Sequence, residues 1–313
     1  MNNKPHIISV SRRTDIPAYY SGWFRERLEN GYTYYENPVT KKPVYADLSP
    51  DCVRAFVFWT RNPKPLFDHL DFIDGRYNKR HYMHFTINGL PVELEERNPK
   101  VEFAIDSAKW LSDRYGDHYV QWRFDPIVIS SITPDDYIVS RFEYIARNLE
   151  GYVKRCYFSY VDLYKKTISN VKKTAEKFNI EFYDYSLNQK IALTNEIKEI
   201  ALRYGITLYA CAEDNLLSAA GVEKAHCVDH DLIALVSGKD FSAKSMPSRI
   251  ECGCIDSRDI GYYDSCPHGC IYCYANMEPG LALMNAKKYK ESGFPFDGMK
   301  NIKDEDSPEL SLF

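Results

Sequence analysis

The sequence predicts an α/β fold, a partial β/α barrel of six strand–helix units followed by a cysteine-rich cap. Six short runs rich in β-branched and aromatic residues recur in the first two thirds of the chain, and most precede a polar turn and a helical segment. Strands that alternate with helices pair in parallel through right-handed crossovers. The chain has 313 residues, of which 44% are hydrophobic, so it can bury a substantial core. A doubly wound sheet is the competing arrangement.

The predicted strands are short, and most of them end in polar residues. They run over His6–Ser11, Arg54–Thr60, His81–Asn88, Tyr119–Ile129, Arg155–Val161 and Ile206–Cys211. Six units at this spacing predict an open or partial (β/α)6 barrel of the TIM type, because each strand lies beside its successor in such folds.

Proline at the start and glycine after the end mark several helices. These are expected to run from Pro17 toward Glu29, from Pro99 to Tyr115 and from Pro134 to Glu150. Apolar periodicity predicts further helices over Lys165–Phe178, Leu187–Tyr204, Glu213–Gly221 and Asp229–Gly238. We expect residues 1–211 to form the barrel, residues 212–292 the cap, and residues 293–313 a loosely ordered tail.

Charge and hydropathy restrict the classes of partner. The formal net charge of −4 gives no general attraction to nucleic acid or to an anionic membrane. No apolar run approaches the roughly 20 residues that span a bilayer, and residues 1–10 lack the apolar stretch of a signal peptide. We therefore expect a cytoplasmic protein that acts on a small molecule and binds neither a membrane nor nucleic acid.

Three cysteines near the C-terminus predict a metal centre. The chain has nine cysteines, and five of them fall between Cys252 and Cys273, which favours metal or redox chemistry over disulfides. Cys266, Cys270 and Cys273 follow the spacing C-x3-C-x2-C. Thiolates crowded so closely are stable when they share a cation. Three such ligands on a four-iron cluster leave one iron open to a small molecule.

Short motifs in the sequence resemble those of two known groups of proteins. The C-x3-C-x-aromatic-C phrase, which includes Tyr272, resembles the motif of the radical S-adenosylmethionine enzymes. The phrases SVSRRTDIP at 9–17, FWTRNP at 58–63 and WRFDP at 122–126, with the final cysteines, are similar to those of a bacterial family catalogued as domain of unknown function 1848. The second resemblance names no substrate.

The first resemblance implies a 4Fe-4S cluster on the three cysteines, with S-adenosylmethionine on the fourth iron and Tyr272 as a shield. It implies a 5′-deoxyadenosyl radical that abstracts hydrogen from an unidentified substrate, and an electron donor such as ferredoxin or flavodoxin. In those enzymes the cysteines usually follow the first strand, whereas here they follow the sixth. Loops at strand ends are neighbours in space, so a late loop can still reach the same barrel mouth.

Polar residues after the predicted strands are the candidate ligands at that mouth. Guanidinium and carboxylate groups there suit a carboxylate, a phosphate or the zwitterionic methionine end of the cofactor. The candidate cofactor-binding residues are Arg12, Arg13, Asp15, Arg61 and Tyr272. The candidate catalytic residues are Arg123, Asp125, Asp162 and Glu213. The alternative is an ion-pair network that only stabilises the strand ends.

Four further cysteines offer a second metal site, either another cluster or a zinc ion. They are Cys211, Cys227, Cys252 and Cys254. The alternative is that Cys211 and Cys227 are small buried hydrophobic residues, as free cysteines usually are. We predict that Cys52 and Cys156 belong to the core.

Two other functions remain open. The cysteines near the C-terminus, with His268 as a further ligand, could hold structural zinc in a binding or electron-transfer protein without radical chemistry. The Cys266–Cys273 phrase is also similar to that of the spore photoproduct lyases, which implies nucleic-acid repair or modification. The acidic balance of the chain weighs against that second alternative.

Overall fold

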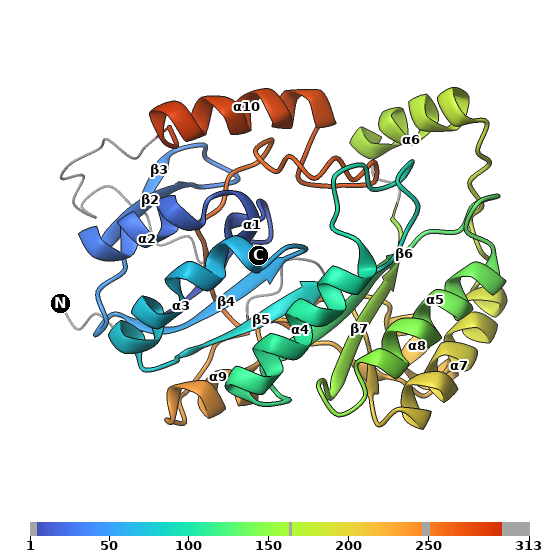
Figure 1. Ribbon diagram of the computed structural model, residues 1–313, viewed down its shortest axis with the longest axis horizontal. Helices are drawn as coiled ribbons and strands as arrows, with labels where there is room; N and C mark the ends of the chain where they lie inside the picture. The colour runs from blue at the N-terminus through green and yellow to red at the C-terminus, as the bar shows by residue number, and fades with distance from the viewer. Residues whose placement is uncertain (1–4, 163–164, 246–250, 296–313) are drawn as a thin grey trace.

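One eight-stranded parallel sheet organises the structure, a computed structural model that describes residues 5–162, 165–245 and 251–295 (Figure 1). The strand order is β10-β1-β4-β5-β6-β7-β8-β9, and every neighbouring pair is parallel. The six long strands are β1 His6–Val10, β4 Val53–Thr60, β5 His81–Thr86, β6 Val120–Ile127, β7 Arg155–Tyr160 and β8 Thr207–Ala210. Two short edge strands complete the sheet, β9 Glu223–Lys224 and β10 Arg258–Asp259.

The predicted parallel α/β class and its six strands are confirmed. Consecutive long strands are also spatial neighbours, which contradicts a doubly wound order, in which the strand order reverses within the sheet. In the part of the chain that the structure describes, the sheet is open, with β9 and β10 as its edges, so a closed barrel is not found. Both edge strands come from the region that we assigned to the cap.

Ten helices occur in the described ranges. They are α1 Ile16–Tyr19, α2 Ser21–Asn30, α3 Lys64–Tyr77, α4 Val101–Tyr115, α5 Asp135–Asn148, α6 Lys165–Phe178, α7 Leu187–Arg203, α8 Asp214–Ala219, α9 His230–Ser237 and α10 Pro279–Ser292. The first predicted helix is divided at Tyr20 into α1 and α2. No helix in the described residues is long and apolar enough to cross a membrane.

Besides the two edge strands, the sequence analysis did not predict α3, α10 or the antiparallel hairpin of β2 Tyr32–Glu36 and β3 Pro43–Asp47. A glycine inside α3, at Gly75, and the Pro279-Gly280 pair at the start of α10 both read as turn signals. Of the predicted tail, residues 296–313 lie outside the described residues.

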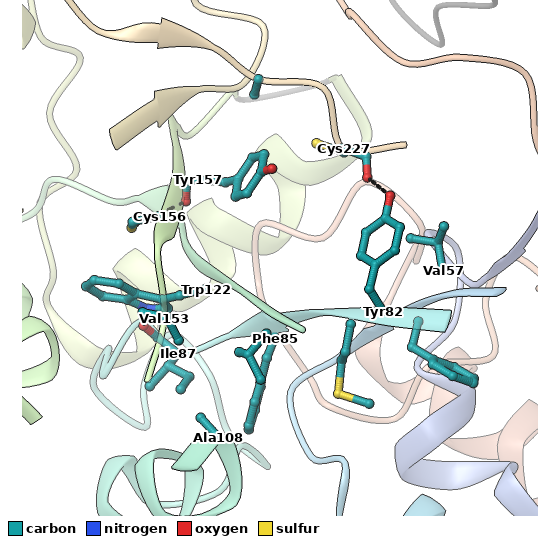
Figure 2. Packing of buried hydrophobic residues seen from close by; sticks show 14 of the residues in the cluster. Val57, Tyr82, Phe85, Ile87, Ala108, Trp122, Val153, Cys156, Tyr157 and Cys227 are labelled. Atoms are coloured by element: carbon teal, nitrogen blue, oxygen red, sulfur yellow. Dashed lines mark hydrogen bonds between the residues drawn. The ribbon is translucent and has the colours of Figure 1, made fainter. Parts of the chain in front are cut away.

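The face of the sheet that meets α4 and α5 is apolar. The ring of Trp122 on β6 lies 4.9 Å from that of Phe142 on α5. Phe85 on β5 points toward Ala108 of α4 (Figure 2). Cys156 on β7 is fully buried, as predicted for a core residue. Burial of these large side chains stabilises the sheet against its helices.

The opposite face carries polar and aromatic side chains. The rings of Trp59 and His84 stack at 4.3 Å, and the Arg123 guanidinium lies 5.2 Å from the centre of the Trp59 ring. Tyr82 projects to this side of β5, and its hydroxyl donates to the carbonyl oxygen of Cys227 at 2.8 Å (Figure 2). Because side chains alternate along a strand, one run of residues supplies both the core and this polar face.

A buried histidine stabilises the amino end of the sheet. His81 begins β5, and its Nε2 lies 2.9 Å from Asp74 Oδ1 on α3 while its Nδ1 lies 2.8 Å from the Tyr119 hydroxyl. Burial lowers the pKa of His81 below 6.5, and the bond to Asp74 only partly opposes that shift. Burial acts to raise the pKa of Asp74, but the bonds from His81 and Arg114 hold it below 3.8.

These shifts predict a stability that falls on acidification. Below pH 6.5 the unfolded chain protonates His81 before the folded chain does, so the unfolded state binds more protons and the free energy of unfolding decreases. The stability that the ionised Asp74 carboxylate contributes is lost only below pH 3.8. We expect His81→Gln to lower the slope of unfolding free energy against pH just below 6.5, by up to about 1.4 kcal/mol per pH unit. Urea unfolding at a series of pH values measures it, and an unchanged slope contradicts the assignment.

Candidate functional site

The three cysteines lie on a loop that crosses the carboxyl ends of β1 and β4. We call residues 265–276 the cysteine loop. The hydroxyl of Tyr20 donates to the Ser265 carbonyl at 2.6 Å, and the hydroxyl of Tyr274 donates to the Arg12 carbonyl at 2.7 Å. The loop and α10, which follows it, run along the end of the sheet near α6 (Figure 1). The cysteine loop therefore lies beside the end of the first strand, although it comes late in the chain.

Asp15 connects the cysteine loop to two strands. Its buried carboxylate accepts from the Thr60 hydroxyl and from the Arg61 backbone N–H, each at 2.7 Å, and from the backbone of α1. His268 Nε2 lies 2.7 Å from the same carboxylate, and His268 Nδ1 lies 3.2 Å from the Tyr19 hydroxyl. Both ring nitrogens of His268 are therefore engaged with protein groups, which leaves the cysteines as the donors of the loop.

Arg61 and Glu95 form a buried ion pair beside the cysteines. Their side chains meet at 2.7 Å, and Arg61 Nη2 donates to the Tyr272 hydroxyl at 2.9 Å. That hydroxyl in turn donates to Glu95. Burial acts to lower the pKa of Arg61, but the nearby Cys270 and Glu95 keep it well above its usual value. Arg61 and Glu95 thus hold the hydroxyl of Tyr272, which stands between Cys270 and Cys273 in the sequence.

The three thiols of the cysteine loop are half-buried, and Cys273 acts on the pKa of both Cys266 and Cys270. Burial, together with Asp15 and Cys273, raises the pKa of Cys266 well above its usual value. Burial also raises the pKa of Cys270 to about 12, although Arg61 opposes the shift. Deprotonation in this setting needs a compensating cation, which is what a metal centre supplies.

A glycine gives the cysteine loop its tight turn. Gly269 has φ of +79°, and a Cβ built there would come within 2.8 Å of the Arg97 guanidinium. The backbone N–H of Arg97 donates to the His268 carbonyl at 3.0 Å. A residue with a side chain would be strained at this position, so glycine allows the backbone to turn between Cys266 and Cys270.

The donor set fits a three-cysteine centre, although the side chains do not converge on a metal position as they stand. In the described ranges, no group of three or more His, Cys, Asp or Glu side chains forms a metal-binding arrangement. The half-buried cysteines offer three soft donors, and Arg61 supplies a cation beside Cys270 that offsets negative charge. Side-chain rotation is required before the three thiols can share one centre.

A largely apolar hollow adjoins the cysteine loop. It has a volume of about 100 Å³ and opens partly to solvent. Ile271 and Tyr272 of the loop form one wall. Residues of the β6–α5 connection, Val161 after β7, Val171 of α6 and residues 182–184 form the rest. A cavity of this size and lining accepts a small apolar group, such as one end of a larger molecule.

Arg12 and Arg13 share one acid, Asp259. Arg13 Nε lies 3.2 Å from Asp259 Oδ1, and Arg13 Nη1 donates to the Glu36 carbonyl at 3.0 Å. Arg12 Nε lies 3.5 Å from Asp259 Oδ2 and its Nη2 donates to Ser257 at 3.2 Å. Burial would raise the pKa of Asp259, but Arg13 and Arg12 hold it below its usual value. The side chains of both arginines thus contact Asp259 of β10, and the backbone carbonyl of Arg12 contacts the cysteine loop.

The predicted catalytic residues form two separate groups. Arg123 pairs with Asp125, whose carboxylate also accepts from the Ser159 hydroxyl. Glu213 accepts from the Tyr160 backbone N–H at 2.8 Å. Burial raises the pKa of Glu213, and Asp162 adds to that shift.

Arg123 also reaches the second cysteine set. Its Nη1 donates to Cys227 Sγ at 3.1 Å, and the Cys227 sulfur lies 3.7 Å from Cys211 Sγ. The pKa of Cys227 responds to Cys211 and Cys254, and that of Cys254 responds to Cys227 and Cys252, so the four thiols lie near one another. The structure therefore brings together the four cysteines that the sequence grouped.

Sequence reasoning missed Glu95 and Asp259, the acids that pair with the predicted arginines. Neither follows a strand of the predicted barrel, and neither stands in a recognisable motif. It also missed Trp59 and His84, whose Nε1 and Nδ1 atoms are buried without a hydrogen-bond partner. Their positions, near the ends of β4 and β5, are the signal that could have identified them.

The Arg61–Glu95 pair gives a test of this geometry in the reduced, metal-free protein. Arg61→Met leaves the Glu95 carboxylate buried without its cation, and we expect a loss of about 3–5 kcal/mol of unfolding free energy. The double variant Arg61→Met, Glu95→Gln should recover part of that loss. Urea unfolding measures both.

The matched control is Arg203→Met on α7, since Arg203 forms an exposed pair with Glu143. This variant should change the unfolding free energy by less than about 1 kcal/mol. If Arg61→Met costs no more than the control, the buried pair is not what stabilises the site.

Comparison with known proteins shows the family. The model of the family described as domain of unknown function (DUF1848) matches residues 7–275. That span contains β4 to β10 and both cysteine sets. No curated protein and no solved structure matches the chain. Since the match covers most of its length, the chain belongs to the DUF1848 family.

Proposed function

We propose that this protein is a radical S-adenosylmethionine-like iron–sulfur enzyme that acts on a small molecule. One observation carries the proposal. Three half-buried thiols lie on one loop at the carboxyl ends of parallel strands, and the histidine among them, His268, is engaged by Asp15 and Tyr19. Three cysteine ligands leave one iron of a 4Fe-4S cluster open, and an open iron is the mark of a catalytic centre.

Cys266, Cys270 and Cys273 would hold the cluster. When bound, the cluster would supply the electron that cleaves S-adenosylmethionine and yields the 5′-deoxyadenosyl radical. An external reductant such as ferredoxin or flavodoxin would replace that electron. The hydrogen abstracted would come from the substrate, and the protein's part is to position that substrate and exclude water.

Asp15, Arg61 and Tyr272 would hold the cysteine loop in place. The Asp15 carboxylate bonds to His268, and the Arg61 guanidinium bonds to Tyr272. Arg61 would also offset the negative charge of a thiolate cluster, because it lies beside Cys270. Arg12 would take the cofactor's carboxylate, since its side chain is partly exposed and its carbonyl bonds to Tyr274 of the loop.

The hollow beside Tyr272 would receive the substrate. Its walls are mostly aliphatic and aromatic, and Asp184 adds a carboxylate. Such a lining favours a substrate with an apolar part and a polar or cationic end. The Asp125 carboxylate on β6 and the Glu213 carboxylate after β8, which bond to Ser159 and Tyr160 of β7, would orient polar groups.

The decisive experiment looks for the cofactor's cleavage product. Cluster reconstitution under anaerobic conditions, followed by S-adenosylmethionine and dithionite, should give a brown protein that releases 5′-deoxyadenosine even without substrate. Cys270→Ala should reduce that release to background, because removing one of three ligands destroys the cluster. Liquid chromatography with mass spectrometry measures the product.

Cys52→Ser is the matched control, since Cys52 lies before β4 and belongs to neither cysteine set. It should release as much 5′-deoxyadenosine as the unaltered protein. A colourless protein that retains zinc after anaerobic preparation contradicts the proposal. So does an intact cluster that leaves S-adenosylmethionine uncleaved.

A further inference from the structure

Four cysteines outside the cysteine loop lie near one another in space, in a row. Cys211 and Cys227 lie with their sulfur atoms 3.7 Å apart. Cys254 acts on the pKa of Cys227, and Cys252 acts on that of Cys254. Cys227 and Cys254 are buried, whereas Cys211 and Cys252 are half-buried. The group therefore extends from the polar face of the sheet toward solvent.

Three separate backbone segments bring these thiols together. Cys211 directly follows β8, Cys227 lies between β9 and α9, and the other two precede β10. The carbonyl oxygen of Cys227 lies 2.6 Å from His84 Nε2 and accepts from the Tyr82 hydroxyl, both on β5. The fold positions these segments through backbone contacts of their own, so the thiols are not needed to hold them there.

The sulfur–sulfur distance favours a shared metal over a disulfide. A disulfide bond is about 2.05 Å long, well below the observed 3.7 Å. Two thiolates on a tetrahedral zinc ion, with Zn–S of about 2.3 Å, lie about 3.8 Å apart. The pair Cys211 and Cys227 already has the spacing of two ligands of one metal ion.

The surroundings supply donors that thiolate ligands use. Arg123 donates to Cys227 Sγ at 3.1 Å, and its Nη2 lies 3.8 Å from Cys211 Sγ. The Val228 backbone N–H donates to Cys254 Sγ at 3.4 Å. Four thiolates around a divalent ion carry a net charge of about −2, which a buried guanidinium stabilises. Cys156, by comparison, is a buried cysteine on the other face, against the helices.

We propose that Cys211, Cys227, Cys252 and Cys254 form a second, tetrathiolate metal centre, separate from the one assigned to the cysteine loop. Binding replaces the four thiol protons, which leave to solvent, and no electron is transferred. The outer two side chains must turn inward about their χ1 angles to close the coordination sphere, since the thiols now follow one another in a row. Four protein ligands leave no open position, so this centre is not a site of substrate binding.

The test uses the full chain without the cysteine loop's ligands. In the variant C266S/C270S/C273S, reduced and metal-free, a titration with Co²⁺ should bind about one equivalent per chain and produce the absorption of a tetrahedral thiolate complex. Zn²⁺ should displace the cobalt. The analysis of iron and zinc in anaerobically purified protein identifies the natural metal, and either metal in this variant supports the proposal.

Single substitutions in that background locate the ligands. Cys252→Ser and Cys211→Ser, at half-buried positions, should each weaken Co²⁺ binding by on the order of 100-fold. Cys52→Ser should leave it unchanged, and circular dichroism verifies that each variant is folded. Absence of thiolate absorption in the C266S/C270S/C273S variant overturns the proposal. A Cys211–Cys227 disulfide in anaerobically prepared protein overturns it as well. Because the cysteine loop is already disabled in this background, neither result bears on the proposed radical chemistry.

Discussion

The carboxylate of Asp15 is the constraint on which the arrangement of this end of the sheet depends. It accepts from the backbone N–H of Ala18 at the start of α1, from the hydroxyl of Thr60 at the end of β4, and from His268 of the cysteine loop. One buried acid thus joins two neighbouring strands to a segment more than two hundred residues later in the chain. Such a group is tolerated in the interior only when its oxygens are satisfied, and here four donors satisfy them.

The sequence predicted the strands because their pattern is local. In β4, β5 and β6, large apolar residues alternate with polar or aromatic ones. This two-residue period is expected for a sheet that packs one of its faces against helices, because successive side chains point to opposite faces. It did not predict the two short edge strands or the open sheet. Glu223–Lys224 and Arg258–Asp259 are each two residues long and polar, so they become strands only because a longer strand lies beside them.

The same distinction applies to the candidate site. The spacing of Cys266, Cys270 and Cys273 and the polar residues after each strand were visible in the sequence. Which acid pairs with which arginine was not, since Arg61 pairs with Glu95 on a loop and Arg13 with an acid 246 positions away. Partners of this kind are chosen by tertiary packing and leave no periodic signal. In contrast, the four cysteines of the second set were grouped from their number alone, and the fold places them beside Arg123 on the polar face of the sheet.

Charge balance connects the two cysteine sets. Burial disfavours a positive charge at Arg12, yet Asp259, Cys254 and Cys227 raise its pKa, and Arg12 in turn acts on Tyr274 beside Cys273. Arg12 and Arg13 share the carboxylate of Asp259, and the Arg12 side chain stays partly exposed. Arg12 therefore lies within electrostatic range of both cysteine sets. Metal-bound thiolates would add to the negative charge that Asp259 supplies there, and the guanidinium would in turn favour the ionised form of those thiols.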